Sequence, residues 1–319
     1  MLEGDEMFLK ERVAPELLES LPRLLHRLPK GHAAYESVML DRYKIKAGFG
    51  GEQHVDSILR QACWREPILV IRDLQLADRF CQIDTVILTS HFALILEVKN
   101  YSGTLSFDEK SLHMKQETRD GKLLGYNSPV TQVWNAQEEL KVLFEHFDVS
   151  LPVYACVVLP YATTLIERAP AEMPVVYGYS LKRFISSLPR TGSPMPPDEM
   201  AHVGQLLIDR HRPYSKKDFQ EWYRFSTADL KRGVLCSICG SHCMKKSQRV
   251  FFCDNCNLPS EDGYSRALAD WFDFVAPEIS NAQCREFLGL KDKYAVRYLM
   301  DKMGLGRRGN ARGVRYYQE

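Results

Sequence analysis

Three charged residues lie in or beside two strongly apolar runs of the sequence. Asp84 lies inside the run of residues 82–88, and Glu97 and Lys99 come at the end of the run that starts at residue 92. A carboxylate in a buried run is costly unless it is paired or bound to a metal ion. Because a carboxylate-held Mg²⁺ neutralises phosphate charge and activates water, these residue types are suited to phosphodiester hydrolysis.

The spacing of the three residues predicts how their side chains are arranged. Residues two apart in a strand point to the same face, so Glu97 and Lys99 project together while Val98 faces the other way. If the two runs are neighbouring strands, Asp84 lies across from Glu97 and the two acids share one metal ion. Lys99 then orients the attacking water or stabilises the developing charge. The alternative is that Glu97 and Lys99 form an ordinary solvated ion pair.

The elements around these residues indicate an α/β core. Apolar runs at 68–71, 82–88 and 92–98 predict three strands that are buried on both faces. Helical spacing follows a glycine-rich turn at 48–51 and predicts a helix that carries Glu52. A short strand at 103–107, a helix at 130–147 and a further buried strand at 153–159 complete the order.

Four short motifs occur in a fixed order between residues 45 and 160. They are GFGGE at 48–52, QID at 82–84, EVKNYSG at 97–103 and PVTQ at 129–132. As a set they resemble the nuclease-related domain (NERD) family, a branch of the PD-(D/E)xK nuclease superfamily. The resemblance implies a restriction-endonuclease-like mixed sheet flanked by helices. The chain departs from the family pattern at residue 128, where a serine separates an asparagine from a proline that are expected to be adjacent.

The resemblance also implies a role for each residue of the site. Asp84 and Glu97 would bind a catalytic Mg²⁺ or Mn²⁺, and Lys99 would assist the water. Glu52 matches the family's helix glutamate, and Gln132 matches a glutamine that approaches the same site, so both join the catalytic set. From the residues alone, Glu52 is equally a first-turn acid that complements the helix dipole, and Gln132 a helix-capping residue.

Five of the nine cysteines lie between residues 236 and 256. In a reducing compartment, clustered cysteines are more often metal ligands than disulfide partners. They include two C-x₂-C pairs, which are typical of a zinc ribbon in which four thiolates hold one structural Zn²⁺. The pairs are Cys236 with Cys239 and Cys253 with Cys256. The gap between them is slightly short for the common pattern, so Cys243 or His242 is an alternative for one ligand.

The end of the chain predicts two helices and a hairpin. A serine cap at residue 280 begins a short helix that ends at Gly289, and a second helix covers 292–303 with Ala295, Leu299 and Met303 facing inward. The glycine- and arginine-rich stretch at 306–317 predicts a β-hairpin. Two helices joined by a tight turn and followed by a basic hairpin are similar to winged helix-turn-helix modules that bind nucleic acid.

Arginines give this end of the chain local positive charge. The formal net charge of +1 does not decide nucleic-acid binding, because such a surface needs only a local basic patch. The residues expected to contact nucleic acid are Arg297, Arg307, Arg308, Arg312 and Arg315. Because clustered arginines also occur without a ligand, the alternative is a solvated basic terminus.

Length and composition indicate several folded parts. The chain has 319 residues, of which 45% are hydrophobic and 26% charged, and this excludes a disordered or fibrous class. We divide it into a helical N-terminal lead (1–46), a nuclease-like domain (47–160), a linking or accessory region (161–233), a zinc ribbon (234–262) and a winged-helix-like module (265–319). Because the start lacks a secretory signal and no run has membrane-spanning length, we expect a cytoplasmic protein without a membrane partner.

These features together predict a metal-dependent phosphodiesterase that cleaves nucleic acid. DNA is preferred over RNA as its partner, in DNA processing, repair or defence. The runner-up hypothesis is a non-catalytic nucleic-acid-binding or regulatory protein that retains the nuclease-like fold as a scaffold. A third hypothesis is a structural zinc protein that acts through protein partners.

Overall fold

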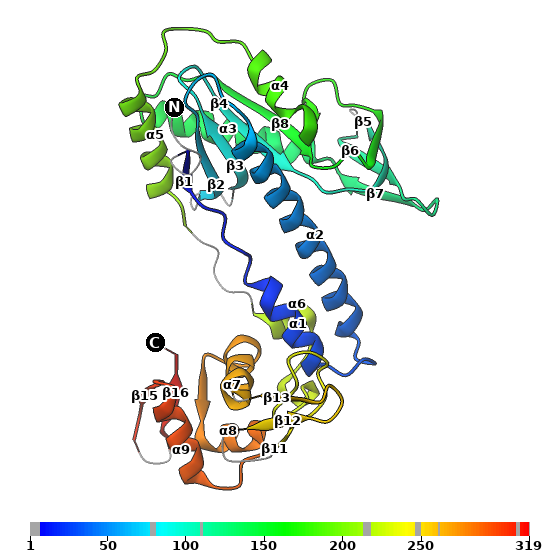
Figure 1. Ribbon diagram of the computed structural model, residues 1–319, viewed down its shortest axis with the longest axis vertical. Coiled ribbons are helices and arrows are strands. Elements are labelled where there is room, and N and C mark those ends of the chain that lie inside the picture. Colours follow the sequence, from blue (N-terminus) through cyan, green and yellow to red (C-terminus); the bar gives the residue numbers. More distant parts are fainter. Residues whose placement is uncertain are drawn as a thin grey trace. The chain divides into compact units, whose positions relative to one another are not determined.

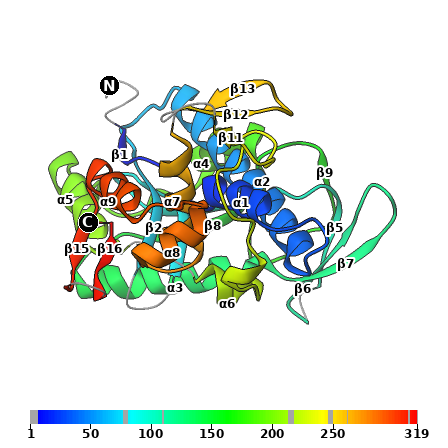
Figure 2. The same cartoon turned by 90° about the horizontal axis from the view of Figure 1, so that it is seen from below.

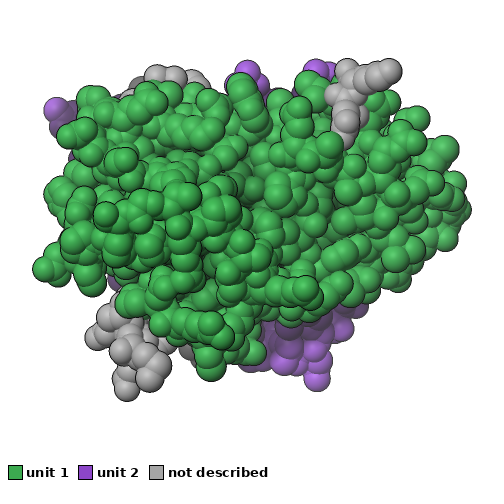
Figure 3. All heavy atoms as spheres, turned by 90° about the horizontal axis from the view of Figure 1, so that it is seen from above, with its two compact units in different colours: residues 1–14, 47–215 green, residues 15–46, 216–319 purple. Residues whose placement is uncertain are grey.

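The computed structural model describes residues 7–76, 81–108, 111–212, 218–245, 250–260, 262–310 and 313–318. The chain forms two compact units. The first unit combines residues 1–14 with 47–215, and the second combines 15–46 with 216–319 (Figure 3). Each unit therefore contains part of the N-terminal lead, and each is described separately below.

A six-stranded mixed sheet forms the centre of the first unit. In spatial order its strands are β1 (Phe8–Lys10), β2 (Leu69–Leu76), β3 (Cys81–Leu88), β4 (Ala93–Val98), β8 (Val153–Leu159) and β10 (Val175–Tyr177). β2, β3 and β4 are antiparallel neighbours, whereas β1 is parallel to β2, and β8 is parallel to both β4 and β10. The four central strands that the apolar runs predict are confirmed, and β4 is buried along its whole length.

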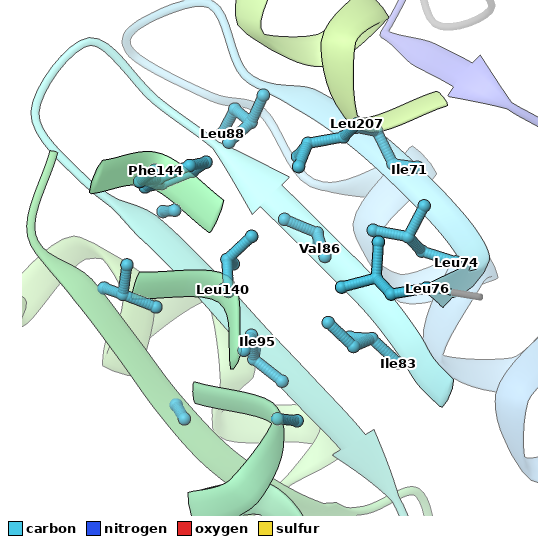
Figure 4. Close-up of a cluster of buried hydrophobic side chains, with 14 of the residues drawn as sticks. Ile71, Leu74, Leu76, Ile83, Val86, Leu88, Ile95, Leu140, Phe144 and Leu207 are labelled. Atoms are coloured by element: carbon cyan, nitrogen blue, oxygen red, sulfur yellow. The ribbon is translucent and has the colours of Figure 1, made fainter. Parts of the chain in front are cut away.

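Helices cover both faces of this sheet. One face is covered by α3 (Pro129–His146) and α5 (Pro197–Asp209), and the other by α2 (Ala34–Gln61) and α4 (Leu181–Ser187). Figure 4 shows Leu140 of α3 and Leu207 of α5 above the apolar side chains of β2, β3 and β4. Since the central strands are covered on both sides, an acid placed on them is cut off from water unless it lies at a strand end.

The glycine-rich stretch at 48–51 lies inside a helix, so the predicted turn is wrong. α2 is continuous from Ala34 to Gln61. A Cβ on Gly51 would lie 3.1 Å from Cβ of Asn100 and 3.2 Å from Cγ of Pro160. These two residues follow β4 and β8, so the helix passes close to the ends of the strands. Glycine allows this close approach because it has no side chain. Since glycine also lowers helix propensity and is common in turns, the same residues indicated a turn in the sequence.

A second sheet of four strands also belongs to the first unit. In spatial order it contains β7 (Leu123–Asn127), β6 (His113–Glu117), β5 (Gly103–Asp108) and β9 (Thr164–Arg168). The short strand predicted at 103–107 is confirmed as β5. Figure 1 shows β5, β6 and β7 extending away from the main sheet. The chain therefore enters a separate sheet soon after Lys99.

The second unit has a helical core to which the N-terminal lead contributes. α1 (Leu17–Arg27) and α6 (Phe219–Tyr223) both pack against α7 (Gly263–Phe274). Arg27 of α1 is fully buried, and its Nε donates to Oδ2 of Asp270 at 2.7 Å. Its Nη1 donates to the carbonyl oxygens of Lys231 and Gly233, at 2.8 Å each. One satisfied buried cation thus joins α1 to two later segments of the chain, residues 231–233 and α7.

Two short elements complete the second unit before its last module. A three-stranded antiparallel sheet contains β11 (Met244–Lys245), β12 (Phe251–Cys253) and β13 (Leu258–Ser260). A 3₁₀ turn, η3 (Thr227–Asp229), precedes it, and a similar turn in the first unit, η2 (Gly178–Ser180), leads into α4.

The predicted C-terminal helices and hairpin are confirmed. α8 (Asn281–Leu288) and α9 (Lys293–Lys302) are followed by β15 (Gly306–Arg308) and β16 (Arg315–Tyr317), which pair with β14 (Glu278–Ser280) in the order β14-β16-β15. α8 begins at a Ser280 capping box and ends at Gly289, whose φ of 69° suits glycine. Figures 1 and 2 show α7, α8, α9 and the hairpin grouped together.

The buried side of α9 differs from the predicted one. Val296 and Met300 are fully buried, whereas Ala295, Leu299 and Met303 are only partly buried. Leu299 and Met303 do pack against the core as predicted, but the fully buried stripe lies one position further along the helix. Two adjacent stripes at i, i+4 spacing are both apolar here, and only the packing partners of the helix decide between them.

Among the helices of the described ranges, none combines the length and the apolar character that a membrane span requires.

Candidate functional site

Asp84 and Glu97 lie next to each other on the antiparallel strands β3 and β4. The register pairs Thr85 with Leu96, so Asp84 and Glu97 are the next residues along the two strands. Oδ2 of Asp84 accepts the backbone N–H of Val98 at 2.8 Å. This bond fixes the Asp84 carboxylate against the strand that carries Glu97.

Glu97 is buried with one of its carboxylate oxygens unpaired. Its side chain is only 1% exposed, and its Oε1 accepts a hydrogen bond from Nζ of Lys99 at 2.6 Å. Lys99 also donates to Oε1 of Gln132 at 3.0 Å. Among the described residues, no donor reaches Oε2 of Glu97. Because a buried oxygen without a partner is costly, this atom is suited to bind a cation.

Burial and mutual repulsion control the ionisation of this cluster. Burial raises the pKa of Asp84. Burial, followed by the charge of Asp84, raises the pKa of Glu97 to about 7. Burial alone would lower the pKa of Lys99, but the charge of Glu97 and their hydrogen bond raise it above its usual value. Lys99 therefore stays cationic at neutral pH, while the two acids hold protons more tightly than usual.

Glu52 belongs to the same electrostatic cluster. Burial, and then the charge of Asp84, raises the pKa of Glu52 to about 7, although Arg12 lowers it. Glu52 in turn contributes to the raised pKa of Glu97. Since Glu52 lies in the interior of α2, the alternative of a first-turn acid at a helix dipole is wrong.

Gln132 does not cap α3. The capping residue is Ser128, whose side chain accepts the backbone N–H of Val130. Gln132 instead receives the hydrogen bond from Lys99. The serine that interrupts the family pattern therefore has a structural role, and Gln132 is free to face the acidic cluster.

Three charged residues beside the site were missed by the sequence analysis. Arg12 forms ion pairs with Glu52, Asp56 and Asp73, with N–O distances of 2.8, 2.8 and 2.6 Å. The one available signal was Asp56, an acid beside Val55 on the buried face of a helix, because such an acid requires a partner. Arg12 gave no signal, since nothing in the polar start of the chain indicates what it contacts.

Comparison with known proteins gives one match. The family model described as "Nuclease-related domain" matches residues 47–160. These residues form a nuclease-related domain. No curated protein and no solved structure matches the chain.

The nuclease-related domain offers carboxylate donors of the kind that hard divalent cations bind, although among the described residues only the cysteine group has ligand atoms that all lie within 4.8 Å of one another. Asp84, Glu97 and Glu52 offer carboxylate oxygens, which Mg²⁺ and Mn²⁺ prefer. Oε2 of Glu97 is buried and has no hydrogen-bond partner among the described residues, so a bound cation would compensate for its burial. Lys99 donates to Oε1 of this acid and to Gln132, and Oε2 has no donor among the described residues.

The second unit contains a separate group of metal-ligating residues. The sulfur atoms of Cys236, Cys239, Cys253 and Cys256 lie within 4.8 Å of one another. Two of the sulfur pairs are 3.6 and 3.9 Å apart. Thiolates at ~2.3 Å from a tetrahedral zinc ion are ~3.8 Å apart, so the group is able to hold Zn²⁺.

The alternative zinc ligands are not part of this group. Nε2 of His242 lies 3.0 Å from the carbonyl oxygen of Arg232. Cys243 lies outside the set of four whose sulfur atoms converge. The cysteine pairs predicted from their spacing are therefore the ones that the fold brings together.

Four of the five arginines expected to contact nucleic acid lie in the described residues, and all four are exposed. Arg297 lies on α9, 3.9 Å from Asp301. Arg308 and Arg315 are direct neighbours across the hairpin, and Arg308 pairs with Glu278 at 2.5 Å, whereas Arg307 lies opposite Tyr316. Arg312 lies outside the described residues. Their contact with nucleic acid stays a prediction.

We expect Mn²⁺ affinity to rise steeply between pH 5.5 and 8. The pKa values of Glu52 and Glu97 are raised from 4.5 to about 7, and a metal ion binds their deprotonated forms. By the same linkage, the metal-free fold loses stability as the pH rises from 4.5 to 7, since the folded state retains protons that the unfolded chain releases. Calorimetric titration in buffers of different ionisation enthalpy measures affinity and proton release together. The control variant Glu117→Gln changes an exposed carboxylate and should keep the wild-type dependence of Mn²⁺ affinity on pH. A pH-independent Mn²⁺ affinity would contradict the assignment of Glu52 and Glu97 as metal ligands.

For the cysteine group, we expect about one zinc ion per chain by metal analysis of protein purified without chelator. Replacing both Cys236 and Cys253 by serine should remove the zinc and unfold the ribbon locally while the nuclease-related domain stays folded. Cys243→Ser is the matched control and should retain the metal. Zinc-free wild-type protein, or loss of zinc in the control alone, would count against the four-cysteine site.

Proposed function

We propose that this chain is a divalent-metal-dependent nuclease that hydrolyses phosphodiester bonds of nucleic acid, with DNA as the preferred substrate. The observation that carries the proposal is the buried Glu97 carboxylate, whose Oε2 has no partner among the described residues and which lies beside Asp84 and Lys99. This cluster lies in the nuclease-related domain, and that family implies interaction with nucleic acid.

Each residue of the cluster has a distinct role in the proposed reaction. Asp84 and Glu97 would hold Mg²⁺ or Mn²⁺, with Glu52 as a further carboxylate. The bound cation would neutralise phosphate charge and favour deprotonation of the attacking water. Lys99, kept cationic by Glu97, would stabilise the negative charge that develops on the phosphate oxygens. Gln132 accepts a hydrogen bond from Nζ of Lys99 and so limits where the ammonium group lies.

The other parts of the chain suit a nucleic-acid substrate. The cysteine group would hold a structural zinc ion and stabilise a segment too small to have a large core. The order of helices and strands from α7 to β16 is the order expected for a winged helix-turn-helix, in which α9 would enter a groove and the β15–β16 hairpin would contact phosphates. We therefore assign docking to the C-terminal module and chemistry to the nuclease-related domain.

For the catalytic cluster, we expect Asp84→Ala, Glu97→Ala and Lys99→Ala each to abolish metal-dependent cleavage. Binding of nucleic acid should remain largely intact, because the cation and the water are needed for chemistry more than for docking. The assay incubates purified protein with several forms of DNA and RNA, with and without Mg²⁺ or Mn²⁺.

The control for this assay is Asp120→Asn, which changes an exposed carboxylate and should cleave at the wild-type rate. Wild-type cleavage by Asp84→Ala would remove the proposed site. A folded wild-type protein that binds nucleic acid but cleaves none of the substrates would favour the non-catalytic alternative.

For the C-terminal module, we expect the triple variant Arg307→Ala, Arg308→Ala, Arg312→Ala to weaken binding to all sequences. Each neutralised phosphate releases counterions, so the dependence of affinity on salt should flatten by up to about three units, roughly one for each lost phosphate contact. Cleavage at saturating protein should persist, because the acidic cluster belongs to the other unit.

The matched control replaces three exposed arginines of the second unit that lie outside this module, namely Arg42, Arg224 and Arg232. This control should keep the wild-type salt dependence. If the hairpin variant retains wild-type affinity and salt dependence, the module does not touch nucleic acid.

A further inference from the structure

Arg12 is a buried cation that contacts Glu52 and the backbone of Asp84, two residues of the acidic cluster. Its side chain is only 3% exposed. Nη1 donates to Oε2 of Glu52 at 2.8 Å and to Oδ1 of Asp73 at 2.6 Å. Nε donates to Oδ2 of Asp56 at 2.8 Å, and Nη2 donates to Oδ1 of the same residue at 3.2 Å.

The same guanidinium also contacts strand β3 at the position of the site. Nη2 of Arg12 donates to the carbonyl oxygen of Asp84 and to Oγ1 of Thr85, at 3.0 Å each. Arg12 thus bridges α2, which carries Glu52, and β3, which carries Asp84. A planar group with five donors holds such partners in one geometry more firmly than a single ion pair does.

Asp56 depends on Arg12 less than Glu52 does. Asp56 has a second buried cation, because Nη1 of Arg72 donates to its Oδ2 at 3.1 Å. Among the described residues, the one ion pair of Glu52 is with Arg12, at 2.8 Å. Removing Arg12 would remove the contact that fixes the position of the Glu52 carboxylate.

We propose that Arg12 is a positioning residue that holds Glu52 as the third carboxylate of the metal site. This inference rests on the proposed function. Arg12 binds Oε2 of Glu52, so Oε1 is the oxygen that remains available to the cation. Arg12 lies outside residues 47–160 that match the family model, in the segment that follows β1. The nuclease-related domain of this chain is therefore completed by a residue from the N-terminal lead.

The test measures Mn²⁺ affinity of the full chain by calorimetric titration. Groups that orient metal ligands typically contribute about tenfold to hundredfold in affinity, so Arg12→Met should weaken Mn²⁺ binding by about that factor. Glu52→Gln should weaken binding to a similar extent, and Arg12→Met should cause little further loss in the Glu52→Gln background. If Arg12 only stabilised the fold, its loss would have the same effect in both backgrounds.

Two further variants keep the test decisive. Arg12→Lys retains the charge but not the fork of donors, and should give an intermediate loss even if Arg12→Met does not fold. Glu117→Gln removes an exposed carboxylate that does not contact Arg12, and it should leave Mn²⁺ affinity within about twofold. Tighter Mn²⁺ binding by Arg12→Met would show that Arg12 competes with the cation and would overturn the proposal.

The outcome is separable from that of the proposed function. Wild-type Mn²⁺ binding that is lost in Asp84→Ala and weakened in Arg12→Met supports the role of Arg12, even if no substrate is cleaved. Unchanged Mn²⁺ affinity in Arg12→Met and Arg12→Lys would overturn that role while cleavage by the wild type still stood. Absence of Mn²⁺ binding in the wild type would also overturn it, and the cleavage assay would decide the proposed function independently.

Discussion

The first unit depends on one constraint, which is the burial of acidic side chains at the centre of an apolar sheet. Asp84 and Glu97 are neighbours on two strands that helices cover on both faces, so neither acid can be solvated as a surface carboxylate is. Lys99 and the backbone N–H of Val98 supply only part of the missing polar contacts. Oε2 of Glu97 has no partner among the described residues, and this unpaired oxygen makes the cluster a candidate functional site.

The same constraint explains why distant segments converge on the site. Glu52 lies on a helix that must pass close to the strand ends, which Gly51 permits. Its charge adds to the repulsion among the acids, and the cation that opposes it comes from the start of the chain. The N-terminal segment therefore contacts the acidic cluster, although it lies outside the family match. A similar logic operates in the second unit, where the buried Arg27 is satisfied by Asp270 and by two backbone carbonyls.

Much of the local structure was predictable because short-range periodicity carries it. Strands β3 and β4 follow from apolar runs, and the period of two along a strand predicts that Glu97 and Lys99 share a face. The spacing of the four cysteines predicts their convergence, because a tetrahedral site admits few arrangements. Periodicity was insufficient where two readings share one pattern, as for the glycines at 48–51 and for the two apolar stripes of α9. In both cases the structure depends on packing partners that lie elsewhere in the sequence: they determine that residues 48–51 are helical and which stripe of α9 is buried.

By itself, the sequence determined which residues could do chemistry and which strands carry them, since residue type and local spacing are properties of neighbours along the chain. Only the tertiary structure decided that β3 and β4 are adjacent with Asp84 next to Glu97, that Gln132 faces Lys99 because Ser128 caps the helix, and that Arg12 supports Glu52. These contacts join residues far apart in sequence, and no local pattern specifies them. They arise because a buried charge must find a partner wherever the fold provides one.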